Sequence, residues 1–109
     1  MDARAWVGCW LAAASFAAAA AGWVVPQALW ERPRTAAVIM AEPTIKQAVN
    51  SCLAQPNSQL VIHHAVGQEP LVQAEELRAW LMGLAVEGSR IRLVNDLKPD
   101  AAIVLELTQ

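Results

Sequence analysis

The sequence predicts an α/β domain of the two-layer α+β type behind one N-terminal transmembrane helix. Two observations support this. No charged residue occurs from Ala5 to Val25, whereas nearly all acids and bases come after Trp30. Beyond Trp30, apolar residues recur alternately with the spacing of strands and of helices. We therefore expect an anchor over residues 1–30 and a small domain over residues 31–109.

The apolar run has the length of a membrane span, since roughly 21 residues make a helix of about 31 Å and the hydrocarbon core is about 30 Å thick. Tryptophan favours the membrane interface, and we expect four such residues there: Trp6, Trp10, Trp23 and Trp30. Pro26 would end the helix. A cleaved secretory signal is the alternative, because Ala19 to Ala21 would suit a signal peptidase. Its apolar core is usually about 7–15 residues long, so we favour an uncleaved anchor.

The expected anchor is rich in small residues, which let helices approach closely in lipid. The positions that we expect at a helix–helix contact are Gly8, Ala12, Ser15, Ala18, Ala19 and Gly22. This pattern predicts other membrane-protein subunits as partners, besides the bilayer itself; the alternative is an anchor that is simply rich in alanine. Arginines flank both ends of the run, so charge does not set its orientation.

The remaining chain predicts the order β-α-β-α-β-β, with two helices on a four-stranded mixed sheet. Two strand–helix–strand passes favour parallel pairing, and a short last turn favours an antiparallel hairpin. The expected elements are a strand at Thr35–Ala41, a helix at Pro43–Leu53, a strand at Gln59–Val66, a helix at Leu71–Leu84, a strand around Arg90–Leu93 and a strand at Ala101–Leu107.

The second expected helix has a clear apolar stripe, formed by Leu71, Ala74, Leu77, Leu81 and Leu84. Glu75, Glu76 and Arg78 are expected to point to solvent. Of the two cysteines, Cys52 falls on the apolar face of the first helix and Cys9 within the expected membrane span. We expect both to be unpaired.

Composition and spacing argue against several function classes. The chain has eight basic and ten acidic residues and no basic stripe, so nucleic acid is not an expected partner. His63 and His64 are neighbours on a strand and point to opposite faces, so one metal ion cannot use both. No carboxylate is placed to orient a Cys52–His64 pair. We expect no enzyme activity, catalytic residue, metal or cofactor.

Two segments carry a resemblance to a known family. Trp80 to Ile91 is similar to a family helix that ends in a "YL…GI…RI" pattern, and Leu60 to His64 occupies the place of the preceding strand. Together with the element order, they resemble the OmpA-like peptidoglycan-binding domain of bacterial envelope proteins. The resemblance covers about Ala36 to Leu107.

The ligand residues of that family are replaced here. The resemblance implies an aspartate where Ala65, Val66 and Gly67 stand, and an arginine near Gln73. Without these charges, the diaminopimelate of peptidoglycan would lose its charge-assisted hydrogen bonds. The family's third helix is also replaced, by Asn95 to Asp100. The resemblance therefore implies a shortened member that has lost its ligand.

We therefore expect a non-enzymatic, single-pass accessory subunit of a larger bacterial inner-membrane complex, with its C-terminal domain in the periplasm for protein–protein contact. One alternative is an envelope tether that binds peptidoglycan. Another is a transport or energy-coupling component similar to ExbD and TolR. Those proteins carry an aspartate in the membrane helix, which the apolar run of this chain lacks.

Overall fold

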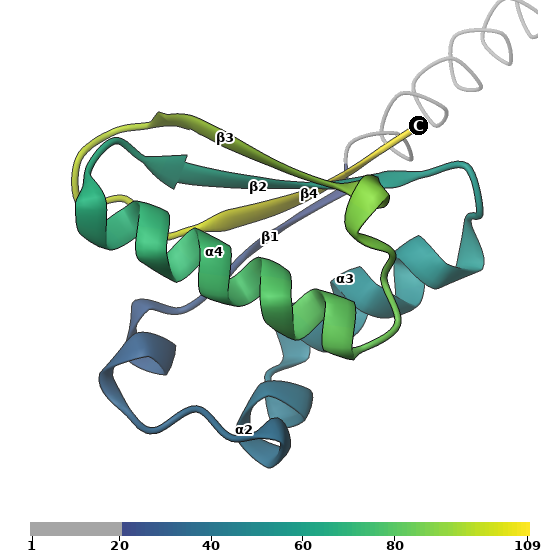
Figure 1. Cartoon of the computed structure of the whole chain (residues 1–109), viewed down its shortest axis with the longest axis horizontal. Helices are drawn as coiled ribbons and strands as arrows, with labels where there is room; N and C mark the ends of the chain where they lie inside the picture. The colour runs from purple at the N-terminus through teal and green to yellow at the C-terminus, as the bar shows by residue number, and fades with distance from the viewer. Residues whose placement is uncertain (1–20) are drawn as a thin grey trace, which may run out of the picture.

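A computed structural model describes residues 21–109. Four strands form one mixed sheet in the order β1-β4-β2-β3, and helices α3 and α4 cover one face of it (Figure 1). The elements are β1 (Ala21–Val24), the 3-10 helix η1 (Gln27–Glu31), α2 (Ala36–Ala41), α3 (Pro43–Ala54), β2 (Gln59–Ala65), α4 (Gln68–Gly83), the 3-10 helix η2 (Gly88–Arg90), β3 (Ile91–Leu97) and β4 (Val104–Thr108). The predicted α+β class and mixed four-stranded sheet are confirmed.

The first strand lies where the end of the membrane helix was expected. β1 pairs antiparallel with β4, from Ala21 opposite Leu107 to Val24 opposite Val104. Val24 and Val25 are β-branched and favour extended backbone. Val25 is restricted to extended backbone also because it precedes Pro26. The folded domain thus includes Ala21 and does not begin after Trp30. Within residues 21–109, no helix combines the length and apolar character that crossing a membrane requires.

The segment expected as the first strand is instead the helix α2. The side chain of Thr35 caps this helix, because its hydroxyl accepts a hydrogen bond from the backbone N–H of Val38 at 3.2 Å. Alanines at the start of α2 favour helix as well. Glu42 then caps α3 by accepting from the backbone N–H of Thr44 at 3.2 Å. The expected strand is therefore wrong, although Pro43 does begin a helix as predicted.

The last two strands do not form the expected hairpin. β3 pairs parallel with one edge of β2, and β4 pairs antiparallel with the other edge. β4 lies inside the sheet, between β1 and β2, where its apolar side chains Leu105 and Leu107 are buried. β3 carries the exposed Arg92 and Asp96, which suit an edge strand. Polarity thus decides which strand lies inside the sheet.

The core lies between the sheet and the two long helices. α3 packs on β1 and β4, and α4 packs on β2 and β3. The predicted stripe of α4 is confirmed at Ala74, Leu77 and Leu81, but Leu71 is 41% exposed. The largest fully buried side chains are Leu29, Ile39, Ile45, Leu60, Ile62, Leu77, Leu81, Leu105, Val25, Val86, Cys52 and Ser58.

Leu81→Ala should lower the free energy of unfolding by about 2–5 kcal/mol, because Leu81 is fully buried and truncation leaves a cavity. An exposed position of the same helix gives the control, since Glu75→Ala should change stability by no more than about 0.5 kcal/mol. Denaturant unfolding of the two variants measures both values. Equal midpoints would mean that the buried face of α4 is wrongly assigned.

Candidate functional site

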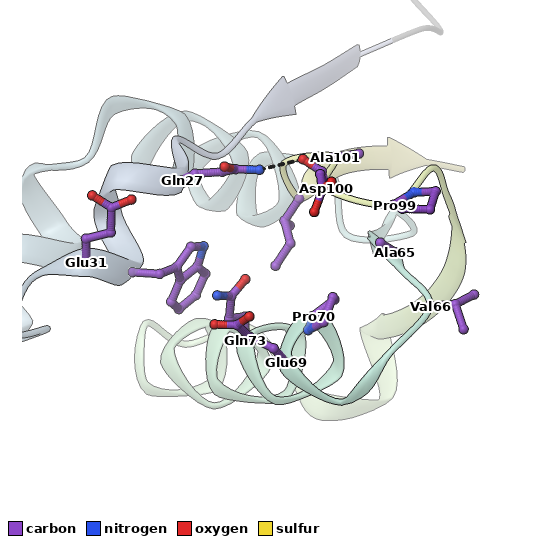
Figure 2. Close-up of a pocket in the computed structure, with 12 residues that line it drawn as sticks. Gln27, Glu31, Ala65, Val66, Glu69, Pro70, Gln73, Pro99, Asp100 and Ala101 are labelled. Atoms are coloured by element: carbon purple, nitrogen blue, oxygen red, sulfur yellow. Dashed lines mark hydrogen bonds between the residues drawn. The ribbon is translucent and has the colours of Figure 1, made fainter.

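A cavity of about 410 Å³ lies where β2 ends and α4 begins (Figure 2). Three segments surround it: η1, the β2–α4 corner and the loop that joins β3 to β4. Its lining residues are Gln27, Trp30, Glu31, Ala65, Val66, Glu69, Pro70, Gln73, Pro99, Asp100, Ala101 and Ile103. We refer to this cavity as the corner pocket.

A sharp turn brings the first turn of α4 to the pocket. Gly67 adopts a φ of 132°, which L-residues with a Cβ rarely reach, and it lets the chain leave β2 and enter the helix at once. The first turn of α4 then presents Glu69 and Pro70, and the next turn presents Gln73. Figure 2 shows these side chains projecting from α4 toward η1 and the β3–β4 loop.

The opposite wall is fixed by η1 and its contacts with the end of the sheet. The N–H of Val25 donates to the carbonyl of Ile103 at 2.8 Å, which extends the pairing beyond β1. Leu29 anchors η1 in the core with 1% exposure. The amide of Gln27 donates to the carbonyl of Asp100 at 2.8 Å and ties η1 to the β3–β4 loop (Figure 2). These contacts close the pocket on that side.

An arginine clamp holds Trp30 against α4. The Arg34 guanidinium donates twice to the Glu76 carboxylate, at 2.5 and 3.1 Å, and once to the Trp30 carbonyl at 3.0 Å. It also lies over the Trp30 ring at 5.3 Å from the centroid. Glu76 accepts a further hydrogen bond from Trp80 at 3.1 Å. Glu76 therefore does not simply face solvent, and the hydrogen bond from Arg34 lowers the pKa of its carboxyl.

The charge of the pocket is acidic. Glu31, Glu69 and Asp100 contribute carboxylates, Gln27 and Gln73 contribute amides, and the lining contains no lysine, arginine or histidine. All three carboxylates are exposed to solvent. The carboxylates of this lining can accept hydrogen bonds from a cationic group, and such charge-assisted hydrogen bonds are stronger than neutral ones. It offers no nucleophile with an adjacent base.

The structure brings together the positions at which the resemblance implies a ligand site. Ala65, Val66 and Gln73 all line the corner pocket. Sequence patterns alone did not predict the pocket residues that η1 and the β3–β4 loop supply, among them Gln27 and Asp100. Pro26 was the available signal, because a proline after two valines also fits the end of a strand.

The expected membrane residues divide into two groups. Gly22 and Trp23 lie in β1 rather than in a helix, and the Trp23 indole donates to the side-chain oxygen of Gln47 at 3.1 Å. Trp30 lines the corner pocket and packs on the core. These three residues therefore belong to the domain. The remaining positions lie outside the described residues: Trp6, Trp10, Gly8, Ala12, Ser15, Ala18 and Ala19.

The two histidines have separate surroundings, as predicted. His64 is buried, and its Nδ1 lies 2.8 Å from the carbonyl of Ala65. On the other face of the sheet, His63 lies between two carboxylates: Nδ1 is 2.8 Å from Asp96 and Nε2 is 2.8 Å from Glu106. In residues 21–109, no group of three histidines, cysteines or carboxylates could hold a metal ion.

The environment of His63 favours its charged form. Partial burial lowers the pKa of the imidazole, but hydrogen bonds to Glu106 and Asp96 and the negative charge of both carboxylates outweigh that effect. The pKa of His63 therefore lies above its ordinary value of 6.5. As an imidazolium, the side chain can donate to the carboxylates of both neighbouring strands and link β3 to β4 across β2.

No protein-family model, curated protein or solved structure matches this chain.

His63→Gln should destabilise the protein by on the order of 1 kcal/mol at about pH 5.5, and by less at about pH 9. A raised folded-state pKa means that the contribution of His63 is complete below the unfolded pKa of about 6.5. It is then lost as the pH rises through the folded-state value. Denaturant unfolding of both proteins across this range measures the difference. A difference that stays constant with pH would contradict the ion-pair assignment.

Proposed function

We propose that the protein is a non-enzymatic accessory subunit of a bacterial inner-membrane complex, and that its domain lies on the periplasmic side. In this proposal, the corner pocket receives a basic side chain from a partner subunit. The observation that carries it is the lining, in which three carboxylates surround a concave surface without any basic residue. Complementary charge of this kind favours specific and rapid protein association.

The N-terminal sequence supports a location at or beyond the membrane. Because β1 includes Ala21, the uninterrupted apolar run before the domain is Ala5 to Ala20, roughly 16 residues or about 24 Å as a helix. That length is short for the hydrocarbon core of about 30 Å and close to a secretory signal core of about 7–15 residues. A cleaved signal would deliver the domain to the periplasm, and a short anchor would do so with its N-terminus in the cytoplasm, which is the orientation that the proposal requires.

The pocket also supports a binding role over a catalytic one. A general base or nucleophile needs a partner within hydrogen-bond reach that tunes its proton affinity. Glu31, Glu69 and Asp100 are exposed and have no such partner among the side-chain contacts of the described residues. Cys52 is buried against Ser58 and Arg90 in the core, away from the pocket lining.

Peptidoglycan is the second candidate ligand. The corner pocket includes Ala65, Val66 and Gln73, and the chain keeps a strand–helix–strand–helix–strand–strand order if α2 and the 3-10 helices are set aside. The pocket carboxylates could bind the amine of a diaminopimelate. They would repel its carboxylate, for which the lining offers no guanidinium. This candidate therefore ranks below a cationic protein side chain.

Neutralising the pocket should abolish partner binding without unfolding the domain. In the Glu31→Gln, Glu69→Gln, Asp100→Asn variant, recovery of the partner after purification in mild detergent should fall about tenfold or more. Each hydrogen bond to a charged group is worth about 1.5–3 kcal/mol. Mass spectrometry identifies and quantifies the chains that co-purify.

Neutralising Glu75 and Glu87, which are exposed outside the pocket, is the matched control and should leave recovery unchanged. Equal recovery with the pocket variant would contradict the proposal. If no chain co-purifies and the protein instead sediments with peptidoglycan in a manner that free diaminopimelate competes away, the second candidate is correct.

A further inference from the structure

β3 forms an open edge of the sheet. It pairs with β2 along one side only, and the strand order ends with it. In Figure 1 no described element lies beyond β3 on its outer side. A strand in this position presents a row of unpaired backbone N–H and C=O groups that another strand can use.

The two edges of the sheet differ in how they are protected. β1 is four residues long and is followed closely by Pro26, and such features limit pairing. β3 is seven residues long and contains no proline. A register shift against β2 and the charges of Arg92 and Asp96 still limit its pairing to a strand of complementary charge. Its apolar residues Leu93, Val94 and Leu97 remain only half-buried. β3 is therefore the edge with unused apolar surface and unused hydrogen-bonding groups.

The charges on β3 are arranged symmetrically about its centre. Arg92 lies opposite Val61 and Val94 lies opposite His63, on the face of the sheet away from the helices. Asp96 shares that face, because its carboxylate contacts His63 at 2.8 Å. The register of β3 against β2 shifts between Val94 and Leu97, on either side of Asp96. One positive and one negative side chain thus stand two residues on either side of Val94.

This arrangement is self-complementary in one orientation. If two copies of β3 run antiparallel about a two-fold axis at Val94, Arg92 of each copy lies opposite Asp96 of the other. Directly opposite side chains in such a pair have Cβ atoms about 4.5–5.5 Å apart, close enough for an ion pair. Parallel pairing in the same register would instead place like charges together.

We propose that this edge is a homodimer interface, in which β3 pairs antiparallel with β3 of a second copy and joins the two sheets. Each copy supplies the same surface, as a two-fold interface requires. No residue of β3 lines the corner pocket. The proposed strand pairing therefore uses no residue of the pocket lining, and it does not depend on the proposed partner subunit.

Charge reversal tests the pairing on the full chain in mild detergent. The wild-type protein should sediment as a dimer. Arg92→Asp alone and Asp96→Arg alone should each raise the dimer dissociation constant about tenfold or more, because like charges then face each other. An equimolar mixture of the two variants should form a heterodimer, since each reversed charge meets its opposite again. Differently tagged copies make the heterodimer detectable.

Two controls separate the interface from other effects. His63→Gln removes the ion pair that Asp96 forms with His63 within one chain, and it should leave the dimer intact. In a Cys9→Ser background, Val94→Cys should cross-link two copies under mild oxidation, whereas Val24→Cys on the other edge should not. A monomeric wild-type protein would overturn the proposal. So would a dimer that survives both reversals, or equal cross-linking at Val24 and Val94.

Discussion

The pairing of Ala21–Val24 with β4 is the constraint on which the rest of the domain depends. β4 has an apolar inward face, with Leu105 fully buried, and it needs a neighbour on both sides to satisfy its backbone groups. β2 supplies one neighbour and β1 the other. This pairing also sets the chain's path, because a strand that runs antiparallel to β4 must deliver η1 to the end of the sheet where β4 begins.

The corner pocket follows from that path. η1 arrives beside the end of β2, the start of α4 and the β3–β4 loop, and none of these alone encloses a cavity. The Gln27–Asp100 and Arg34–Glu76 contacts then hold η1 and the following segment against the loop and the helix. Because the three carboxylates of the pocket come from three segments far apart in sequence, its charge depends on the fold as a whole.

The sequence predicted the elements whose apolar periodicity is long and regular. α4 buries Ala74, Leu77 and Leu81 as expected, and β2 lies within a residue of its expected bounds. Two short apolar segments were wrongly predicted, Ala21–Val24 as the end of a membrane helix and Thr35–Ala41 as a strand. By hydropathy alone, Thr35–Ala41 fits a helix or a strand equally well. The position of β4 was also missed, because strand order depends on which strand is more polar across the entire sheet. Of the pocket, the family resemblance pointed to Ala65, Val66 and Gln73 as positions where the ligand residues are replaced, but nothing pointed to η1 or the β3–β4 loop. Their residues meet only through long-range pairing.

Amide hydrogen exchange at Gly22 to Val25 tests this account most directly. If these residues form the edge of the sheet, the amide of Val25, which donates to Ile103 at 2.8 Å, should exchange far more slowly than in an unpaired chain. Its protection should fall when β4 is destabilised by Leu105→Ala. Protection at Val25 that is independent of β4, or rapid exchange comparable to that of an exposed loop, would contradict the claim that this segment belongs to the sheet.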